Sequence, residues 1–160
     1  MTIKTGDQVP SVTLHQMIGG TNAAITSEQI FSDKKVVLFA LPGAFTPTCS
    51  AQHLPGFIEL ADQFFAKGVD SIVCLSVNDA FVMDAWGQHQ NVGNKITMLA
   101  DGSGLFTQAA GLEIDRVANG MGMRSQRYAM VVDNGRVELL NVEADGEFKV
   151  SKADVILAAL

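Results

Sequence analysis

Short apolar runs recur along the chain and are separated by amphipathic stretches and turns. The runs are rich in β-branched and aromatic residues, which is typical of buried strands. They cover residues 36–40, 69–77, 96–100, 128–132 and 137–142. The run at 69–77 is almost continuously apolar and contains Cys74. It therefore predicts a central strand covered on both faces, as in parallel or mixed sheets flanked by helices.

The amphipathic stretches predict helices. Residues 51–67 carry apolar side chains at three- and four-residue spacing, and Gly68 ends the stretch. This spacing defines one buried face. Thr26 and Gln29 form a capping-box pattern for a short helix that ends at Phe31. Three further helices are expected at residues 80–89, capped by Asn78-Asp79, at 105–110, and at 152–160, capped by Ser151.

Turn residues complete the order of elements. The sequence Gly19-Gly20-Thr21-Asn22 follows a loosely alternating strand at 7–15 and predicts a hairpin, as does Asn134-Gly135 between two apolar runs. Residues 111–123 are expected to form an irregular connection. Strands and helices alternate before a terminal hairpin and helix, so we expect one layered α/β domain over residues 1–160.

Composition narrows the function classes. The 160 residues are 48% apolar and 18% charged, with a net charge of −6, which disfavours nucleic acid and anionic membranes as partners. No segment is long and apolar enough for a membrane span, and no apolar signal core is present near Met1. Two cysteines are not a disulfide scaffold, so we expect reduced thiols in a cytoplasmic protein. Three scattered histidines do not predict a metal site.

The stretch 41–50 joins a predicted strand to a predicted helix and contains Cys49. Pro47 suits the first helical position, which places Cys49 in the first turn, where unpaired N–H groups and the helix dipole favour a negative charge. The thiolate is the reactive form of cysteine. The alternative is a small buried hydrophobic side chain. The polar neighbours of Cys49 favour the reactive thiol.

The same stretch resembles a known family. The pattern Pro42-x-x-x-Thr46-x-x-Cys49 is similar to the active-site signature of the peroxiredoxins, and the run Pro-Gly-Ala-Phe-Thr-Pro-Thr-Cys-Ser-x-x-His-Leu-Pro-Gly-Phe resembles their type II (peroxiredoxin-five-like) subfamily. The similarity extends to residues 76–83, Trp86 and 127–130. It implies a thioredoxin fold, a central mixed sheet flanked by helices with an N-terminal hairpin addition.

The resemblance also implies a chemistry and its residues. It makes Cys49 the nucleophile that reduces hydrogen peroxide and small alkyl hydroperoxides, with no cofactor. Arg127 would stabilise the thiolate and the peroxide, and the spacing to Tyr128-Ala129-Met130 favours it over Arg124, an auxiliary or solvated charge. The Thr46 hydroxyl would bond the thiolate or cap the helix. Pro42 would shield the thiolate from water or simply end the strand.

Attack on a peroxide leaves a sulfenic acid, which a second thiol must reduce. Cys74 lies in a predicted buried strand, so a structural role is favoured over a resolving role. Residues 145–152, where animal relatives carry a resolving cysteine, have none. The resemblance to bacterial and plant members then implies regeneration by glutathione or glutaredoxin, with thioredoxin as the other candidate reductant.

Other residues leave alternatives open. His53 could pair with Cys49 as in a hydrolase, but it has no obvious orienting partner, and a role in positioning loops is favoured. Phe45, Phe81, Trp86 and Phe106 could line a mouth for alkyl peroxides, pack a homodimer interface or belong to the core. The resemblance implies a homodimer.

Two rival functions have other signatures. A disulfide exchanger would need a Cys-x-x-Cys pair, but Thr46 occupies the partner position. A non-turnover peroxide sensor or chaperone on a thioredoxin fold would use the same reactive thiol. Turnover with an external thiol separates the enzyme from the sensor.

Overall fold

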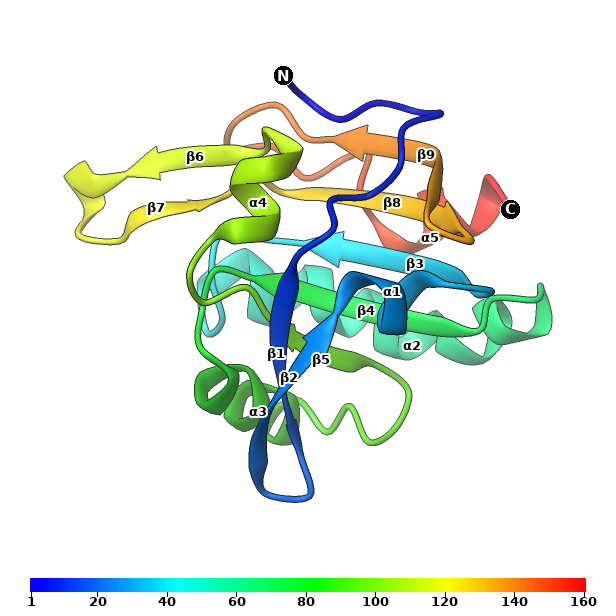
Figure 1. Cartoon of the computed structure of the whole chain (residues 1–160), viewed down its shortest axis with the longest axis horizontal. Helices are drawn as coiled ribbons and strands as arrows, with labels where there is room; N and C mark the ends of the chain where they lie inside the picture. The colour runs from blue at the N-terminus through cyan, green and yellow to red at the C-terminus, as the bar shows by residue number, and fades with distance from the viewer.

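The computed structural model describes residues 1–160 (Figure 1). The elements of its first half are β1 (Thr13–Ile18), β2 (Thr21–Thr26), α1 (Ser27–Phe31), β3 (Lys35–Ala40), a π-helical turn (Cys49–His53), α2 (Leu54–Ala66), β4 (Ser71–Ser76) and α3 (Ala80–His89). Those of its second half are β5 (Thr97–Ala100), α4 (Leu105–Ala110), β6 (Glu113–Arg116), a 3-10 turn (Val117–Asn119), β7 (Gly122–Ser125), β8 (Tyr128–Asp133), β9 (Arg136–Val142) and α5 (Ala153–Ala158).

Seven strands form one mixed sheet in the order β2-β1-β5-β4-β3-β8-β9. The central strands β3, β4 and β5 are parallel, and β1 and β8 join them in the antiparallel direction. The N-terminal hairpin β1–β2 extends one edge, and the hairpin β8–β9 forms the other. The fold is therefore the predicted α/β thioredoxin fold with its hairpin addition.

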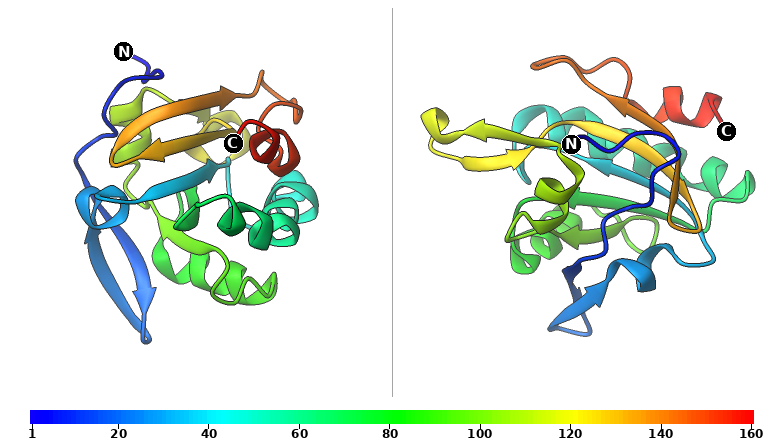
Figure 2. Two further views of the ribbon diagram at one scale, coloured as in Figure 1. Left: turned by 90° about the vertical axis from the view of Figure 1, so that its right-hand side faces the viewer. Right: turned by 45° about the horizontal axis from the view of Figure 1, so that its top comes forward.

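Alternating side chains of the central strands fill a core on each face of the sheet. Val37, Phe39 and Cys74 pack with α2, α3 and α5, whereas Val36 and Leu38 pack with α1 and α4 on the opposite face. The left view of Figure 2 shows α2 and α5 beyond one face of the sheet and α1 on the opposite side. Both faces are covered, which explains why β3 and β4 are almost entirely apolar.

Strand register places three strand ends together. Ala40, the last residue of β3, pairs with Tyr128, the first residue of β8, and Tyr128 also pairs with Val142, the last residue of β9. The residues just beyond these positions are Leu41, Arg127 and Glu143. They therefore lie together at the edge of the sheet formed by the ends of these three strands. The functional site lies at this edge.

Most predicted elements are present. The β1–β2 hairpin, the capping box of α1, the bounds of α3 and α4, and the β8–β9 hairpin agree with the sequence patterns. The strand predicted at 7–15 is shifted, since β1 begins at Thr13 and only Gln8 forms an isolated bridge before it. Phe106 lies in the core, where it stacks on Phe31, and does not flank a surface mouth.

Two predictions of local structure are wrong. Residues 111–123 contain β6 and part of β7, which pair as a two-stranded ribbon that projects from the body in Figure 1. Their four-residue strands are polar and carry no apolar alternation, so no pattern predicted them. Ser151 does not cap α5, because its hydroxyl donates to Glu143 and Lys152 takes the cap position.

None of the helices is both long and apolar enough to cross a membrane.

Candidate active site

The loop after β3 is fastened from two sides. The Asn78 side chain accepts a hydrogen bond from the Ala44 backbone N–H at 3.0 Å, and Ser76 links Asn78 to the Leu41 carbonyl. From the β6–β7 ribbon, Arg124 donates to the Pro42 carbonyl at 3.2 Å. These contacts fix the turn that leads into the helix. Helical backbone begins at Pro47, as predicted.

Cys49 opens a π-helical turn that continues into α2. Its carbonyl accepts a hydrogen bond from the Leu54 N–H, five residues later, which is the wider spacing of a π-helix. Two side chains hold this turn through Ser50. Trp86 of α3 donates to the Ser50 hydroxyl at 3.0 Å, and Gln90, at the C-terminal end of α3, donates to the Ser50 carbonyl at 3.1 Å. Such single π-turns are frequent at functional sites.

The Cys49 thiol is buried beside a permanent cation. One guanidinium nitrogen of Arg127 donates to Cys49 Sγ at 3.2 Å. A guanidinium is charged at every physiological pH, so its position favours the thiolate. The strand register explains this meeting, because Arg127 precedes β8 where β8 pairs with the end of β3.

The other side of the Arg127 fork meets His53. Its second nitrogen lies 2.9 Å from His53 Nδ1, and His53 Nε2 lies 3.1 Å from the Ser151 carbonyl. Arginine only donates and a carbonyl only accepts, so the imidazole must carry its proton on Nε2. Burial, together with the adjacent Arg127 charge, lowers the pKa of His53 to about 3, and the Ser151 carbonyl opposes this shift weakly. His53 is therefore a neutral acceptor for Arg127.

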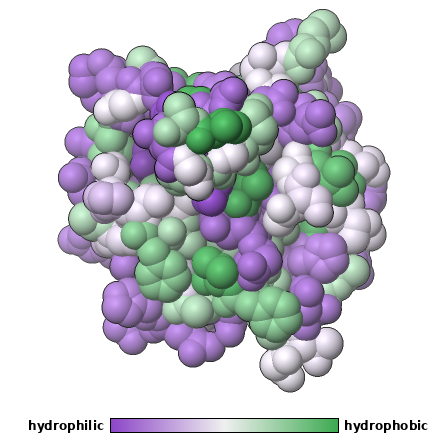
Figure 3. All heavy atoms as spheres, turned by 90° about the vertical axis from the view of Figure 1, so that its left-hand side faces the viewer, coloured by the Kyte–Doolittle hydropathy of each residue, from purple (hydrophilic) through white to green (hydrophobic).

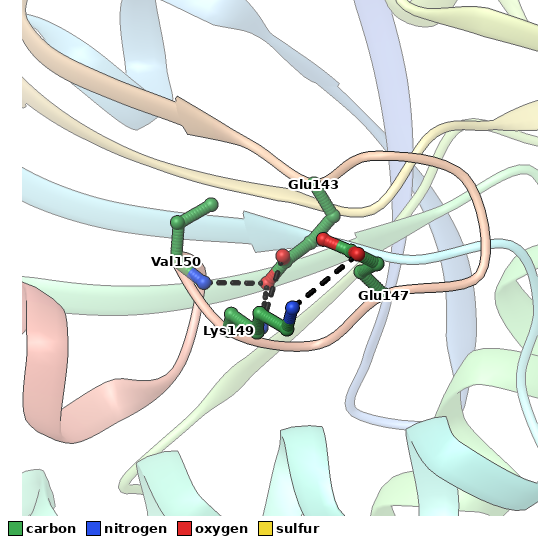
Figure 4. A network of polar contacts seen from close by, with 4 residues as sticks. All are labelled: Glu143, Glu147, Lys149 and Val150. Atoms are coloured by element: carbon green, nitrogen blue, oxygen red, sulfur yellow. Dashed lines mark hydrogen bonds and ion pairs between the residues drawn. The ribbon is translucent and has the colours of Figure 1, made fainter.

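Residues 143–151, here called the 143–151 loop, cover this pair. The Phe148 ring lies edge-on to His53, with 5.1 Å between ring centroids, and 5.7 Å from the Arg127 guanidinium carbon. The buried carboxylate of Glu143 accepts hydrogen bonds from the far end of the same loop (Figure 4). The loop thus excludes water from one side of the arginine.

A cavity of about 210 Å³ adjoins the site. Its wall includes Pro42, Thr48 and Arg127 from around the thiol, and Phe148 and other residues of the 143–151 loop. Arg116 and Gln126 add donors on the ribbon side. Its volume suits a small molecule that contacts the Arg127 cation, and the cavity lies next to the thiol but is not lined by it.

The four residues expected to act together lie in one region. Arg127 touches Cys49, and Pro42 borders the cavity with Arg127. Thr46 lies in the turn before Cys49, but its hydroxyl donates to the Gly43 carbonyl at 2.7 Å and not, as the sequence suggested, to the Cys49 sulfur. That bond uses the hydroxyl proton and leaves the oxygen lone pairs free to accept. Arg124 is half-buried and anchors the Pro42 turn, which is the auxiliary role of the two expected for it.

Cys74 is enclosed in the central strand, as predicted. It is fully buried, and both cysteines are free thiols. Burial raises the pKa of Cys74 well above its usual range, and the neighbouring Cys49 raises it further, while Arg127 opposes the shift. A neutral, buried thiol is a poor nucleophile.

The sequence pattern missed two participants. His53 was expected to position loops, but its bond to Arg127 is a contact that spacing alone cannot reveal. Glu143 carried no signal, because it stands in an ordinary polar stretch, and its role depends on the loop folding back.

The arrangement supports displacement at a peroxide oxygen. It combines a buried thiol, a cation that touches the sulfur, and a small cavity beside that cation. A thioredoxin fold with a reactive cysteine at this strand-to-helix junction defines the class of thiol-dependent redox proteins.

Comparisons with known proteins place the chain within that class. Residues 4–157 match the Redoxin family. The chain is 48% identical over 159 residues to Peroxiredoxin-2B of Arabidopsis thaliana, covering 99% of this chain and 98% of the relative. The chain therefore belongs to the redoxin family, as a peroxiredoxin, and is a thiol-dependent peroxidase of antioxidant type.

Solved structures agree with this membership. Reduced Prx3 of Vibrio vulnificus in complex with H2O2 is 56% identical, with a TM-score of 0.95, and the match covers 99% of each chain. A Plasmodium falciparum antioxidant protein described as a 1-Cys peroxiredoxin is 30% identical, with a TM-score of 0.91 over 96% of each chain.

Proposed function

We propose that the chain reduces hydrogen peroxide and small alkyl hydroperoxides in a one-cysteine cycle that an external thiol, glutathione or glutaredoxin, completes. The observation that carries the proposal is the 3.2 Å contact between Arg127 and the buried Cys49 sulfur, next to a cavity of small-molecule size. The Vibrio vulnificus relative, whose solved structure includes H2O2, supports hydrogen peroxide as a substrate.

In the first step the Cys49 thiolate attacks one peroxide oxygen. A sulfur–oxygen bond forms, the oxygen–oxygen bond breaks, and the leaving oxygen takes a proton to become water or an alcohol. Cys49 is oxidised to sulfenic acid and the peroxide is reduced. Arg127 stabilises the thiolate and the negative charge that develops on the leaving oxygen. Thr46 accepts a hydrogen bond from the peroxide through its free lone pairs, and Pro42 screens the thiol from water.

In the second step a thiol of glutathione attacks the sulfenic sulfur. Water leaves, and a mixed disulfide forms on Cys49. A second thiol then attacks the glutathione sulfur of the mixed disulfide, giving an external disulfide and the Cys49 thiolate. Cys74 takes no part, because it is neutral and enclosed in β4. The relative described as a 1-Cys peroxiredoxin supports this division of roles.

A recycling assay tests the reductant. Purified protein is supplied with hydrogen peroxide and either glutathione with glutaredoxin and its reductase, or thioredoxin with its reductase. We expect sustained peroxide consumption with the first system that Cys74→Ser does not reduce. Consumption with thioredoxin alone would contradict the proposed reductant. A single oxidation without turnover in either system would favour the peroxide sensor.

We also propose a homodimer that acts in the cytoplasm. Phe45 and Phe81 are 51% and 61% exposed, and Phe45 stands beside α3, 5.8 Å from the His89 ring. Hydrophobic side chains gather between polar ones on the side of the molecule shown in Figure 3. Light scattering at micromolar concentration should give twice the chain mass, and Phe81→Asp should halve it. A monomeric mass for the unaltered protein would contradict the dimer.

A further inference from the structure

Glu143 is a buried carboxylate with an unusual number of partners. It lies just past β9, and only 7% of it is exposed. Three successive backbone N–H groups donate to it, from Lys149, Val150 and Ser151, at 2.8–3.0 Å. The Ser151 hydroxyl adds a fourth donor at 2.6 Å. Figure 4 shows the carboxylate turned into the loop that it closes.

These bonds stabilise the ionised form of Glu143. Burial alone would raise the pKa of the carboxyl, but the Ser151 hydroxyl and the three N–H groups outweigh it, so the pKa lies below its usual range. Charge-assisted bonds of this kind are short and strong. The carboxylate therefore fixes the position of the loop end, Ser151, relative to the end of β9.

Ser151 in turn holds the His53 ring in place. Its carbonyl is the partner of His53 Nε2 at 3.1 Å, 98 residues away in sequence. That bond keeps the ring proton on Nε2 and leaves the Nδ1 lone pair for Arg127, at 2.9 Å. Arg127 is then oriented so that its other nitrogen reaches the Cys49 sulfur.

The backbone adds a second tie. The Glu143 N–H donates to the Arg127 carbonyl at 2.9 Å, so one residue holds both ends of the arginine, its main chain directly and its side chain through Ser151 and His53. We propose that Glu143 is a positioning residue for the peroxidatic thiol, acting on Cys49 through Ser151, His53 and Arg127. This inference rests on the proposed function of Cys49.

A purely structural role makes a different prediction. If Glu143 only closed the loop, its loss would lower stability but would leave the His53 tautomer and the behaviour of Cys49 unchanged. Glu138 offers a matched control, because it lies on β9 near Glu143, is exposed and pairs with Lys35, yet it bonds neither Ser151 nor His53 and does not line the cavity. Loss of negative charge is equal in the two substitutions.

The first test compares Glu143→Gln with Glu138→Gln in the reduced full chain. The glutamine amide is uncharged, and it replaces one of the two acceptor oxygens with an NH2 group that only donates, so the charge-assisted bonds to Ser151 weaken. We expect the rate of reaction with hydrogen peroxide to fall by about tenfold, because Arg127 is no longer held in position against the Cys49 sulfur. Glu138→Gln should leave this rate unchanged. Equal effects of the two variants, or no effect of Glu143→Gln, would overturn the proposal.

The second test reads His53 directly and needs no peroxidase activity. Ring ¹⁵N shifts of reduced protein should give a neutral imidazole with its proton on Nε2, and Glu143→Gln should introduce the other tautomer or a charged ring. Ser151→Ala keeps the carbonyl and should preserve the tautomer. A His53 signal that Glu143→Gln leaves unchanged contradicts the proposal, even if the variant is less stable. Because this measurement is independent of turnover, it separates failure of the inference from failure of the proposed function.

Discussion

Among the single residues of the site, Arg127 has two contacts that matter for the chemistry. One guanidinium nitrogen meets the Cys49 sulfur, and the other meets His53. The planar fork can make both bonds at once, which a lysine ammonium on a flexible stem cannot reproduce. The positive charge and its geometry can therefore be separated experimentally.

Arg127→Lys keeps the charge and removes the fork. We expect the rate constant for reaction with hydrogen peroxide to fall by about 100-fold, the cost of losing one well-placed donor to a developing negative charge. Stopped-flow fluorescence or competition kinetics measures it. Arg136→Lys, in the exposed β8–β9 hairpin, is the control and should react at the unaltered rate. A rate for Arg127→Lys within twofold of the parent would contradict the role of the fork.

His53 makes stability depend on pH. Its pKa is about 3 in the folded chain, against an ordinary value of 6.5 for an exposed histidine, so the unfolded chain binds the extra proton first. The contribution of the neutral ring to the free energy of unfolding has its full value above pH 6.5. Below pH 6.5 the free energy of unfolding decreases by about 1.4 kcal/mol per pH unit.

Urea unfolding at pH 6.5 and at about pH 5, where ordinary carboxylates are still ionised, measures this effect. We expect His53→Gln, which keeps an acceptor for Arg127, to be less sensitive to pH across the interval than the parent. The same pH slope in both proteins would show that His53 is not the responsible group.

At the scale of elements, the β6–β7 ribbon supports the Cys49 loop. Arg124 in β7 reaches the Pro42 carbonyl, and a side chain at Gly43 would have its Cβ 2.8 Å from the Arg124 guanidinium and 3.2 Å from the Thr46 methyl. The first of these distances is shorter than real Cβ contacts, so the arginine or the loop must move.

Gly43→Ala should therefore lower the rate with peroxide by about tenfold with a smaller effect on stability. Gly56→Ala in α2 is the control, because its Cβ would make an ordinary 3.6 Å contact with Ala153. That change should leave the rate unaltered and slightly raise the melting temperature, since alanine favours helix over glycine. Equal rates for the two variants would show that the ribbon does not support the site.

The sequence predicted the elements whose pattern is carried by apolar side chains. The strands β3 and β4, the buried face of α2 and the Asn134-Gly135 hairpin follow directly from periodicity and turn chemistry. The π-helical turn at Cys49 did not, because Trp86 and Gln90, which hold it, lie more than 30 residues away in sequence. The β6–β7 ribbon was missed for a different reason: its short polar strands pair with each other and bury little, so they carry no apolar pattern.

Residue roles divide in a similar way. The Cys49, Thr46 and Pro42 motif is local and visible in the sequence, and the resemblance singled out Arg127. The contact of Arg127 with Cys49 depends on the pairing of β3 with β8. His53 and Glu143 depend on a loop that folds back over the site.

At the scale of the whole molecule, sheet topology builds the site. Antiparallel β8 brings Arg127 to the carboxyl end of parallel β3, and β9 brings Glu143 to the same edge. The core on either face fixes these strands, so the site is held by the most buried part of the chain. Cys74, in the next strand, shares this core and not the cavity.

The central claim is that Cys49 alone is oxidised by peroxide. One equivalent of hydrogen peroxide is added to reduced protein, and the intact mass is recorded within seconds for the parent, Cys49→Ser and Cys74→Ser. We predict the gain of one oxygen atom in the parent and in Cys74→Ser, and no change in Cys49→Ser. Loss of two hydrogens that requires both cysteines would mean that Cys74 resolves Cys49, and an unchanged mass in the parent would contradict the peroxidase account.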